Sequence, residues 1–180
     1  MLYNSFCIIQ RKLDSLLTPH GPDTMKIEIN GWDAGIKFSA CHFIPAHNKC
    51  SRLHGHIYAI NARVEGDPNE RGMLWDFIVL KNALRGIADE FDHRVLIPGE
   101  SKEMEIELGD DVKVKMDEKY YVFPLDDVVV MDIKLASAEE LAGFILNRLI
   151  SLLEVPKNVE AIEIGVDEGK GQGAWVRGEF

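Results

Sequence analysis

The sequence predicts an α+β protein with a largely antiparallel sheet. Segments with strand-like patterning outnumber the two segments with helical periodicity, and most connections are short enough to be hairpins. The chain has 180 residues, which corresponds to about one domain and can bury a sizeable core without disulfides. An exposed sheet edge would favour pairing between subunits.

The first 24 residues differ from the rest of the chain. They combine a mildly basic, irregular stretch with a loop rich in Pro and Gly, and they lack a clear signal-peptide pattern. We therefore interpret residues 1–24 as an N-terminal extension and Met25 as a candidate original start. Residues 25–180 then form a single domain, which opens with a strand over residues 25–30.

Strands over residues 35–43 and 54–65 come next, joined by a loop that holds Cys50. In the second of these strands, the period of two places His54, His56 and Tyr58 on one face with three apolar residues. The opposite face is more polar. This face assignment matters because it puts both histidines on the same side of the sheet.

Two helices are predicted from capping residues and apolar spacing. Asp76 can cap the first helix, whose apolar positions follow a helical period over residues 77–91. Ser137 opens the second helix with a capping box, in which Glu140 reaches back to the cap.

Further strands are predicted between and after these helices. Turn residues separate apolar segments over residues 104–108, 112–116, 120–123 and 128–133. A hairpin around three glycines closes the chain, with strands over residues 159–166 and 174–177.

Composition restricts the class of protein and its partners. Hydrophobic residues make up 46% and charged residues 28%, as in an ordinary globular protein. A net charge of −10 argues against nucleic-acid binding through a basic surface. No apolar run approaches the roughly 20 residues of a membrane span. Three cysteines are too few for a disulfide framework and are typical of a reducing compartment, so we expect a cytoplasmic protein.

Three of the six histidines lie within fifteen residues of sequence: His42, His54 and His56. The last two project from one strand face about 7 Å apart, and antiparallel pairing with the preceding strand can bring His42 beside them. Three neutral imidazoles with an open fourth position make a catalytic zinc site. Gly55 would let a ligand approach closely. The alternative is a set of histidines that are merely hydrogen-bonded within a sheet.

Cys50 lies in a polar loop, four residues before the His-Gly-His pair. A thiolate there would be stabilised by a nearby metal and by Lys49 or Arg52, which would make it a competent base or nucleophile. Two alternatives stay open: a fourth ligand, which would close the metal site and make it structural, or an idle loop thiol. Cys41 is interpreted as a packing residue on the opposite strand face.

Asp92 and His93 close the first predicted helix. An aspartate beside a histidine can form an acid–base relay, although the pair could equally be helix C-terminal decoration. Two other histidines, His20 and His47, lie in loops and are interpreted as solvated.

Together these motifs resemble the 6-pyruvoyltetrahydropterin synthase and 6-carboxytetrahydropterin synthase family. The similarity covers residues 26–179, and its specific part is the Cys-x-x-x-His-Gly-His core with the upstream histidine. The matching elements are Phe38-Ser-Ala-x-His42, Cys50-x-x-x-His54-Gly-His56, Asp76-Phe-x-x-Leu-Lys81, Asp92-His93, Ala136-Ser-Ala-Glu139 and the end from Glu168 through Arg177-Gly-Glu179. The stretch over about 100–134 is longer than in compact members, an inserted hairpin region that could reshape substrate entry.

The resemblance implies a T-fold, a four-stranded antiparallel sheet with two helices on one face. In the family, three sheets close into a barrel and two trimers stack into a hexamer. The site residues that it implies are the zinc ligands His42, His54 and His56, the general base Cys50, the proton relay Asp92 and His93 (usually from a neighbouring subunit), and the pterin-binding residues Glu168 and Glu139. Counting back from the Arg-Gly-Glu ending selects Glu168 as the pterin anchor, and strand parity with Ile162 and Ile164 agrees.

The resemblance also implies a reaction on 7,8-dihydroneopterin triphosphate, with zinc as Lewis acid and template for the side-chain hydroxyls. We favour the 6-carboxy-5,6,7,8-tetrahydropterin product, formed with loss of acetaldehyde and triphosphate, because this activity is prevalent among microbial members of the family. In the family this product is a precursor of queuosine- and archaeosine-type tRNA nucleosides. One alternative is the 6-pyruvoyl product, formed by triphosphate elimination. Another is a non-catalytic pterin- or zinc-binding hexamer, which would need neither Cys50 nor the Asp92-His93 pair.

Overall fold

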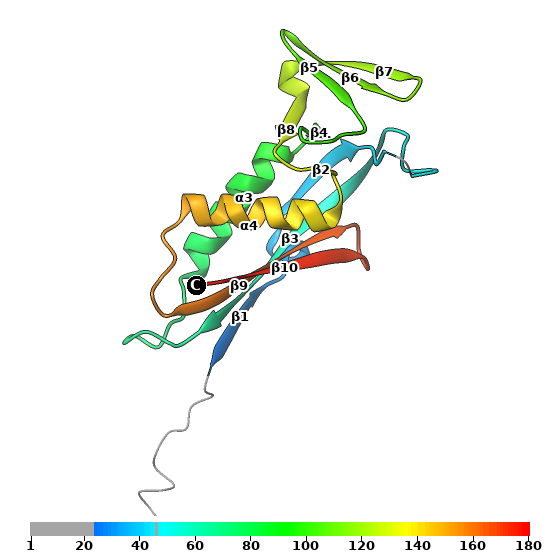
Figure 1. Cartoon of the computed structure of the whole chain (residues 1–180). Coiled ribbons are helices and arrows are strands. Elements are labelled where there is room, and N and C mark those ends of the chain that lie inside the picture. Colours follow the sequence, from blue (N-terminus) through cyan, green and yellow to red (C-terminus); the bar gives the residue numbers. More distant parts are fainter. Residues whose placement is uncertain (1–23, 46) are drawn as a thin grey trace, which may run out of the picture.

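The computed structural model describes residues 24–45 and 47–180, so the expected extension lies almost wholly outside the described residues. The described chain forms one large sheet, one small sheet and two long helices (Figure 1). The elements are β1 (Met25–Ile29), α2 (Gly31–Ala34), β2 (Lys37–His42), β3 (His54–Gly66), α3 (Phe77–Phe91), β4 (Arg94–Pro98), β5 (Glu105–Leu108), β6 (Asp111–Met116), β7 (Lys119–Pro124), η1 (Leu125–Asp127), β8 (Val128–Met131), α4 (Ala138–Leu152), β9 (Val159–Glu168) and β10 (Gly173–Glu179).

The large sheet has the strand order β10-β9-β3-β2-β4-β8, and β1 also pairs with β3. Strands β10, β9, β3 and β2 pair antiparallel, as predicted. Strands β4 and β8 extend the sheet in parallel, so the expectation of four antiparallel strands was too narrow. The reason is that β4 follows helix α3, which returns the chain to run alongside β2 in the same direction.

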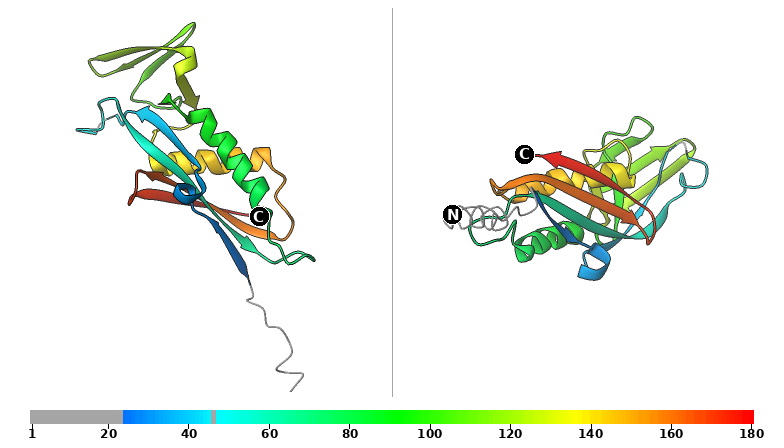
Figure 2. Two further views of the ribbon diagram at one scale, coloured as in Figure 1. Left: turned by 180° about the vertical axis from the view of Figure 1, so that it is seen from behind. Right: turned by 90° about the horizontal axis from the view of Figure 1, so that it is seen from below.

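Helices α3 and α4 pack against one face of this twisted sheet, and Figure 2 shows the arrangement from two further directions. That face carries the inward residues of β2 and β3 that the period of two predicted. The fully buried or nearly buried members from these strands are Phe38, Ala40, Tyr58, Ile60, Ala62 and Val64. The main core therefore lies between the helices and the strands that carry the histidines.

Both predicted helix starts are confirmed. The Asp76 side chain accepts a hydrogen bond from the backbone N–H of Ile78, and the Ser137 side chain accepts one from Glu140. The reciprocal half of the capping box is wrong, because the Glu140 carboxylate accepts from the backbone N–H of Lys134 at 3.4 Å instead.

Strands β5, β6 and β7 form a separate antiparallel sheet within the predicted inserted region, at the top of Figure 1. It has a small core of its own, made of Phe43, Ile97, Met104, Val112, Val114, Met116 and Val128. Phe43 directly follows β2, and its ring stacks on Tyr121 of β7 with centroids 5.3 Å apart. The small sheet is therefore anchored on the chain immediately after His42.

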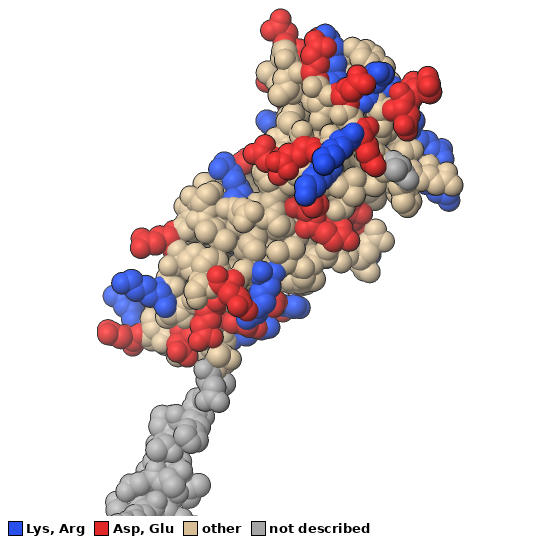
Figure 3. Space-filling model, viewed as in Figure 1, with Lys and Arg blue, Asp and Glu red and all other residues tan. Residues whose placement is uncertain are grey.

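Charged side chains of both signs lie on the surface. On the face shown in Figure 3, acidic and basic side chains are interspersed and no continuous basic patch is visible. None of the helices in residues 24–45 and 47–180 is long and apolar enough to cross a membrane.

Candidate functional site

Three histidines converge at one end of the β2–β3 hairpin. Antiparallel pairing sets His42 opposite His54, and Ala40 opposite His56, so all three imidazoles lie on the same face as the main core. One ring nitrogen from each lies within 4.8 Å of the others. The Nε2 atoms of His42 and His54 are 3.1 Å apart. In the described part of the chain this is the one group of three or more potential metal ligands that meets such a distance.

Backbone carbonyls orient two of these rings. His42 Nδ1 lies 2.6 Å from the carbonyl oxygen of Ala136, and His54 Nδ1 lies 2.7 Å from that of Arg52. Because a carbonyl oxygen can only accept, each Nδ1 must carry the hydrogen, which leaves the Nε2 lone pair free. This is the usual tautomer of a metal-binding histidine.

The donor set fits a zinc ion. Burial, reinforced by the two neighbouring imidazoles, lowers the pKa of His42 to about 4 despite its hydrogen bond to Ala136, so this ring is neutral at pH 7. Two nitrogens bound to a tetrahedral zinc at 2.0–2.1 Å would lie roughly 3.3 Å apart, close to the observed separation of the Nε2 atoms of His42 and His54. The site would need only a small adjustment to accept the ion.

Cys50 lies near this cluster in sequence but is not part of it. The residue is half-buried in the turn between β2 and β3, and the histidine cluster is complete without its sulfur. Two hydrogen bonds close the turn: Ile44 N–H donates to the carbonyl of Cys50 at 2.7 Å, and Cys50 N–H donates to the side-chain Nδ1 of His47 at 3.3 Å. This geometry gives no support to a closed site in which Cys50 is a fourth ligand.

Asp92 and His93 are held against β2 where helix α3 ends. Asp92 Oδ1 accepts from the backbone N–H of Ser39 at 2.7 Å, and its Oδ2 lies 2.8 Å from His93 Nδ1. The Ser39 hydrogen bond, with help from His93, lowers the pKa of Asp92, so the carboxyl is ionised at neutral pH. His93 adopts a positive φ of 59° and donates its backbone N–H to the Ser39 carbonyl.

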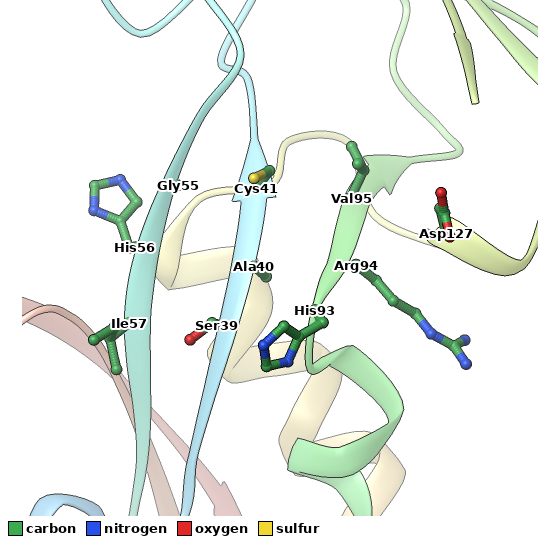
Figure 4. Close-up of a pocket in the computed structure, with 10 residues that line it drawn as sticks. All are labelled: Ser39, Ala40, Cys41, Gly55, His56, Ile57, His93, Arg94, Val95 and Asp127. Atoms are coloured by element: carbon green, nitrogen blue, oxygen red, sulfur yellow. The ribbon is translucent and has the colours of Figure 1, made fainter. Parts of the chain in front are cut away.

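The His93 side chain, 83% exposed, lines a cleft of about 610 Å³. Ser39, Cys41 and Ile57 also line it, and they alternate along β2 and β3 with His42 and His56. His56 itself borders the same cleft. In Figure 4 the His93 ring lies over β2, whereas the His56 ring projects from β3 in a direction away from the His93 ring. Within one chain, the Asp92-His93 pair is therefore not brought onto the sheet face that carries the three histidines.

Glu168 and Glu139 come together beside the histidines. Both line a pocket of about 290 Å³ between the end of β9, the start of β10 and the first turn of α4. Glu168 Oε1 lies 3.8 Å from His42 Nε2. The predicted strand parity is confirmed by the β3–β9 register, which sets Glu168 opposite Tyr58 and Ile164 opposite Ala62, two core-facing residues of β3. A carboxylate-lined pocket thus adjoins the three clustered histidines.

Tyr58 is a residue of this site that the motifs did not reveal. It is fully buried, its ring lies edge-on to His42 and His56, and it stands opposite Glu168 in the β3–β9 pairing. No hydrogen bond of full geometry reaches its hydroxyl among the described residues, although the Glu168 carboxylate lies close enough to interact with it. Burial and the neighbouring Glu168 charge raise its pKa, so the hydroxyl stays protonated. The period of two starting at His54 and His56 was the signal that pointed to it.

We expect Tyr58→Phe to leave the unfolding free energy of the metal-free protein unchanged or to raise it by up to about 1 kcal/mol. A buried hydroxyl without a partner is a desolvation cost that phenylalanine removes while keeping the ring. Urea unfolding of both proteins measures the difference, with Tyr121→Phe as a control in the small sheet. A loss above about 1 kcal/mol would reveal a hydrogen bond that stabilises the native protein.

The fold and the site define an α+β protein with three clustered histidines that could hold a metal ion, beside a pocket lined by carboxylates. The model of the family described as "6-pyruvoyl tetrahydropterin synthase" matches residues 34–179, and the chain belongs to this family.

Relatives and solved structures agree with this assignment. The chain is 32% identical over 157 residues to a protein of Methanocaldococcus jannaschii named "Putative 6-carboxy-5,6,7,8-tetrahydropterin synthase", covering 85% of this chain and 96% of the relative. A Pyrococcus horikoshii protein of the same name is 34% identical over 134 residues, covering 73% and 80%. The crystal structure of 6-pyruvoyl tetrahydropterin synthase from Plasmodium vivax superimposes with a TM-score of 0.81 at 29% identity, covering 87% of this chain and 99% of that one.

Proposed function

We propose that this protein is a zinc-dependent lyase that converts 7,8-dihydroneopterin triphosphate to 6-carboxy-5,6,7,8-tetrahydropterin, releasing acetaldehyde and triphosphate. The observation that carries the proposal is the cluster of His42, His54 and His56 beside the pocket that Glu168 lines. The names of the archaeal relatives support the carboxy product.

His42, His54 and His56 would hold the zinc ion through their nitrogens. Zinc bound there would supply Lewis acidity toward the hydroxyls of the substrate side chain. The hydrogen bonds from His42 and His54 to backbone carbonyls keep those rings oriented, which lowers the entropic cost of assembling the site.

Glu168 would bind the pterin ring and Glu139 would lie nearby. A carboxylate accepts two parallel hydrogen bonds from adjacent N–H donors, such as the amino group and ring N–H of a pterin. The pocket has a volume of about 290 Å³, and its position beside His42 would direct the side chain of a bound pterin toward the three histidines.

Cys50 would act as the general base that removes a proton from the side chain beside the ring. Asp92 and His93 would relay protons, and since they face the cleft on the other side of the sheet, they would serve the site of a neighbouring subunit. This arrangement supports a homo-oligomer, a trimer or a dimer of trimers, in which adjacent chains complete each site.

Mass spectrometry of the products from zinc-loaded protein and 7,8-dihydroneopterin triphosphate tests the proposal. We expect 6-carboxytetrahydropterin together with acetaldehyde. The similarity to the Plasmodium vivax structure supports a second candidate function, that of a 6-pyruvoyltetrahydropterin synthase. A 6-pyruvoyl product would establish this function. Tight pterin binding without turnover would instead indicate a non-catalytic binding protein.

We expect Glu168→Gln to weaken pterin binding at least about tenfold, roughly 1.4 kcal/mol, while the zinc content stays the same. Glutamine keeps the size of the side chain but replaces one acceptor oxygen by a donor, which would oppose the donors of the ring. Titration calorimetry with a non-reactive pterin measures the change.

Glu163→Gln is the matched control on the same strand. Its carboxylate lies on the other face of β9, where it pairs with Arg177 at 3.1 Å and with Arg63 at 3.8 Å. Glu140→Gln is a second control, since that side chain accepts from Lys134 N–H at the start of α4. If Glu163→Gln were the damaging change, the assignment of the pterin anchor on β9 would be wrong.

A further inference from the structure

The small sheet contacts the Cys50 loop, which we define as residues 44–45 and 47–53 between β2 and β3. Lys119, the first residue of β7, donates from Nζ to the carbonyl oxygen of Ser51 at 2.5 Å and to Ser51 Oγ at 3.2 Å. Both hydrogen bonds are partly buried, and they join positions 68 residues apart in the sequence. The contact lies next to Cys50 in the chain.

A second contact holds the beginning of the same loop. Phe43 immediately precedes the loop, is fully buried and belongs to the core of the small sheet. Its ring stacks on Tyr121 at an interplanar angle of 17°. Strand β7 therefore contacts the chain on both sides of Cys50. Tyr121 packs on Phe43 just before the loop, and Lys119 bonds to Ser51 near the end of the loop.

Lys119 differs from the other lysines of this sheet. Lys113 and Lys115 of β6 form ion pairs with Glu107 at 2.8 Å and Glu105 at 3.0 Å, entirely within the small sheet. For Lys119, no carboxylate in the described part of the chain lies within 4.0 Å, so its ammonium is directed to the loop alone. A half-buried ammonium bonded to a main-chain carbonyl fixes the backbone at that point.

We propose that Lys119 is a positioning residue for Cys50: by holding Ser51, it fixes the Cys50 thiol relative to the three histidines. The inference rests on the proposed role of Cys50 as general base. The inserted sheet is then part of the catalytic apparatus rather than a surface addition. Since a misplacement of about 1 Å at a reacting group can cost roughly 100-fold in rate, one anchoring contact can have a large effect.

Lys119→Met tests the proposal, because methionine keeps much of the aliphatic stem and removes the donor. In the zinc-loaded, full-length protein we expect kcat to fall at least about tenfold while KM and zinc content stay within twofold. Lys119→Arg keeps a donor for the Ser51 carbonyl and should recover most of kcat. Lys115→Met, the matched control in the same sheet, should match the wild type.

Hydrogen exchange of the loop amides separates this inference from the proposed function. We expect exchange within residues 47–53 to accelerate at least about fivefold in Lys119→Met and to stay unchanged in Lys115→Met, whether or not the substrate is turned over. Unchanged exchange, or a wild-type kcat in Lys119→Met, would overturn the positioning role. A wild-type protein with no turnover would refute the proposed function, while the exchange result would still decide whether Lys119 holds the loop.

Discussion

Replacing His54 by alanine is expected to abolish stoichiometric zinc binding. Losing a residue that merely orients a ligand typically costs 10–100-fold in metal affinity, so losing a ligand itself should cost at least about 100-fold. His54 is the better target than His42, because it is half-buried at the start of β3, whereas His42 is buried and bonded to Ala136 inside the protein. Elemental analysis after dialysis measures the zinc content, and circular dichroism checks the fold.

His47→Ala is the matched control for this experiment. His47 is exposed in the Cys50 loop, and its ring accepts the Cys50 N–H at 3.3 Å without joining the metal cluster. This variant should keep one zinc per subunit. If His54→Ala also kept one zinc per subunit, the three histidines would be hydrogen-bonded residues of a sheet and not the metal site.

The parts of the fold that depend on local patterns could be predicted from the sequence. Asp76 and Ser137 cap the helices as expected, because a capping side chain bonds to backbone only two or three residues away. The convergence of the three histidines also followed from local rules: a period of two within β3 and a hairpin to β2. The histidine cluster could thus be predicted without any knowledge of the rest of the chain.

Features that depend on contacts distant in sequence could not be predicted. Strand β4 is five residues long, and its parallel place between β2 and β8 is determined by the helix that precedes it and by packing across the sheet. The sheet face on which His93 lies depends on its positive φ and on hydrogen bonds to Ser39, some fifty residues earlier in the chain. Lys119 likewise gave no signal, because its partner Ser51 lies in a different sequence region.

The two faces of the β2–β3 hairpin divide the proposed chemistry. One face carries the histidines, Tyr58 and the pocket with Glu168, and the other opens into the cleft that His93 lines. A general acid or base acts within hydrogen-bond reach of the proton that it transfers, directly or through one bridging water. In the proposed mechanism, Asp92 and His93 therefore act in the site of a second chain. Activity should then require the assembled oligomer, whereas metal binding should not, because all three proposed ligands come from one chain.

Cys50→Ala is expected to keep the fold and the zinc while losing roughly 10²–10⁴-fold in kcat, the usual contribution of a positioned base. The three histidines that could hold a metal ion cluster without Cys50, so removing the thiol should take no ligand from the proposed zinc site. Cys41→Ala is the matched control. Cys41 is half-buried and faces the cleft on the opposite side of β2, so Cys41→Ala should lower kcat less than Cys50→Ala does.

Steady-state kinetics with zinc analysis of the same samples separates the possible roles of Cys50. Loss of both metal and activity in Cys50→Ala would make the thiol a structural ligand, contrary to the cluster geometry. Full activity with full metal would remove Cys50 from the mechanism, and the base would then have to be sought elsewhere. The expected result is full zinc content with little activity, and it would assign the thiol to proton transfer. A ligand role would also have cost zinc, and the small change in side-chain size from Cys to Ala does not explain so large a loss in kcat.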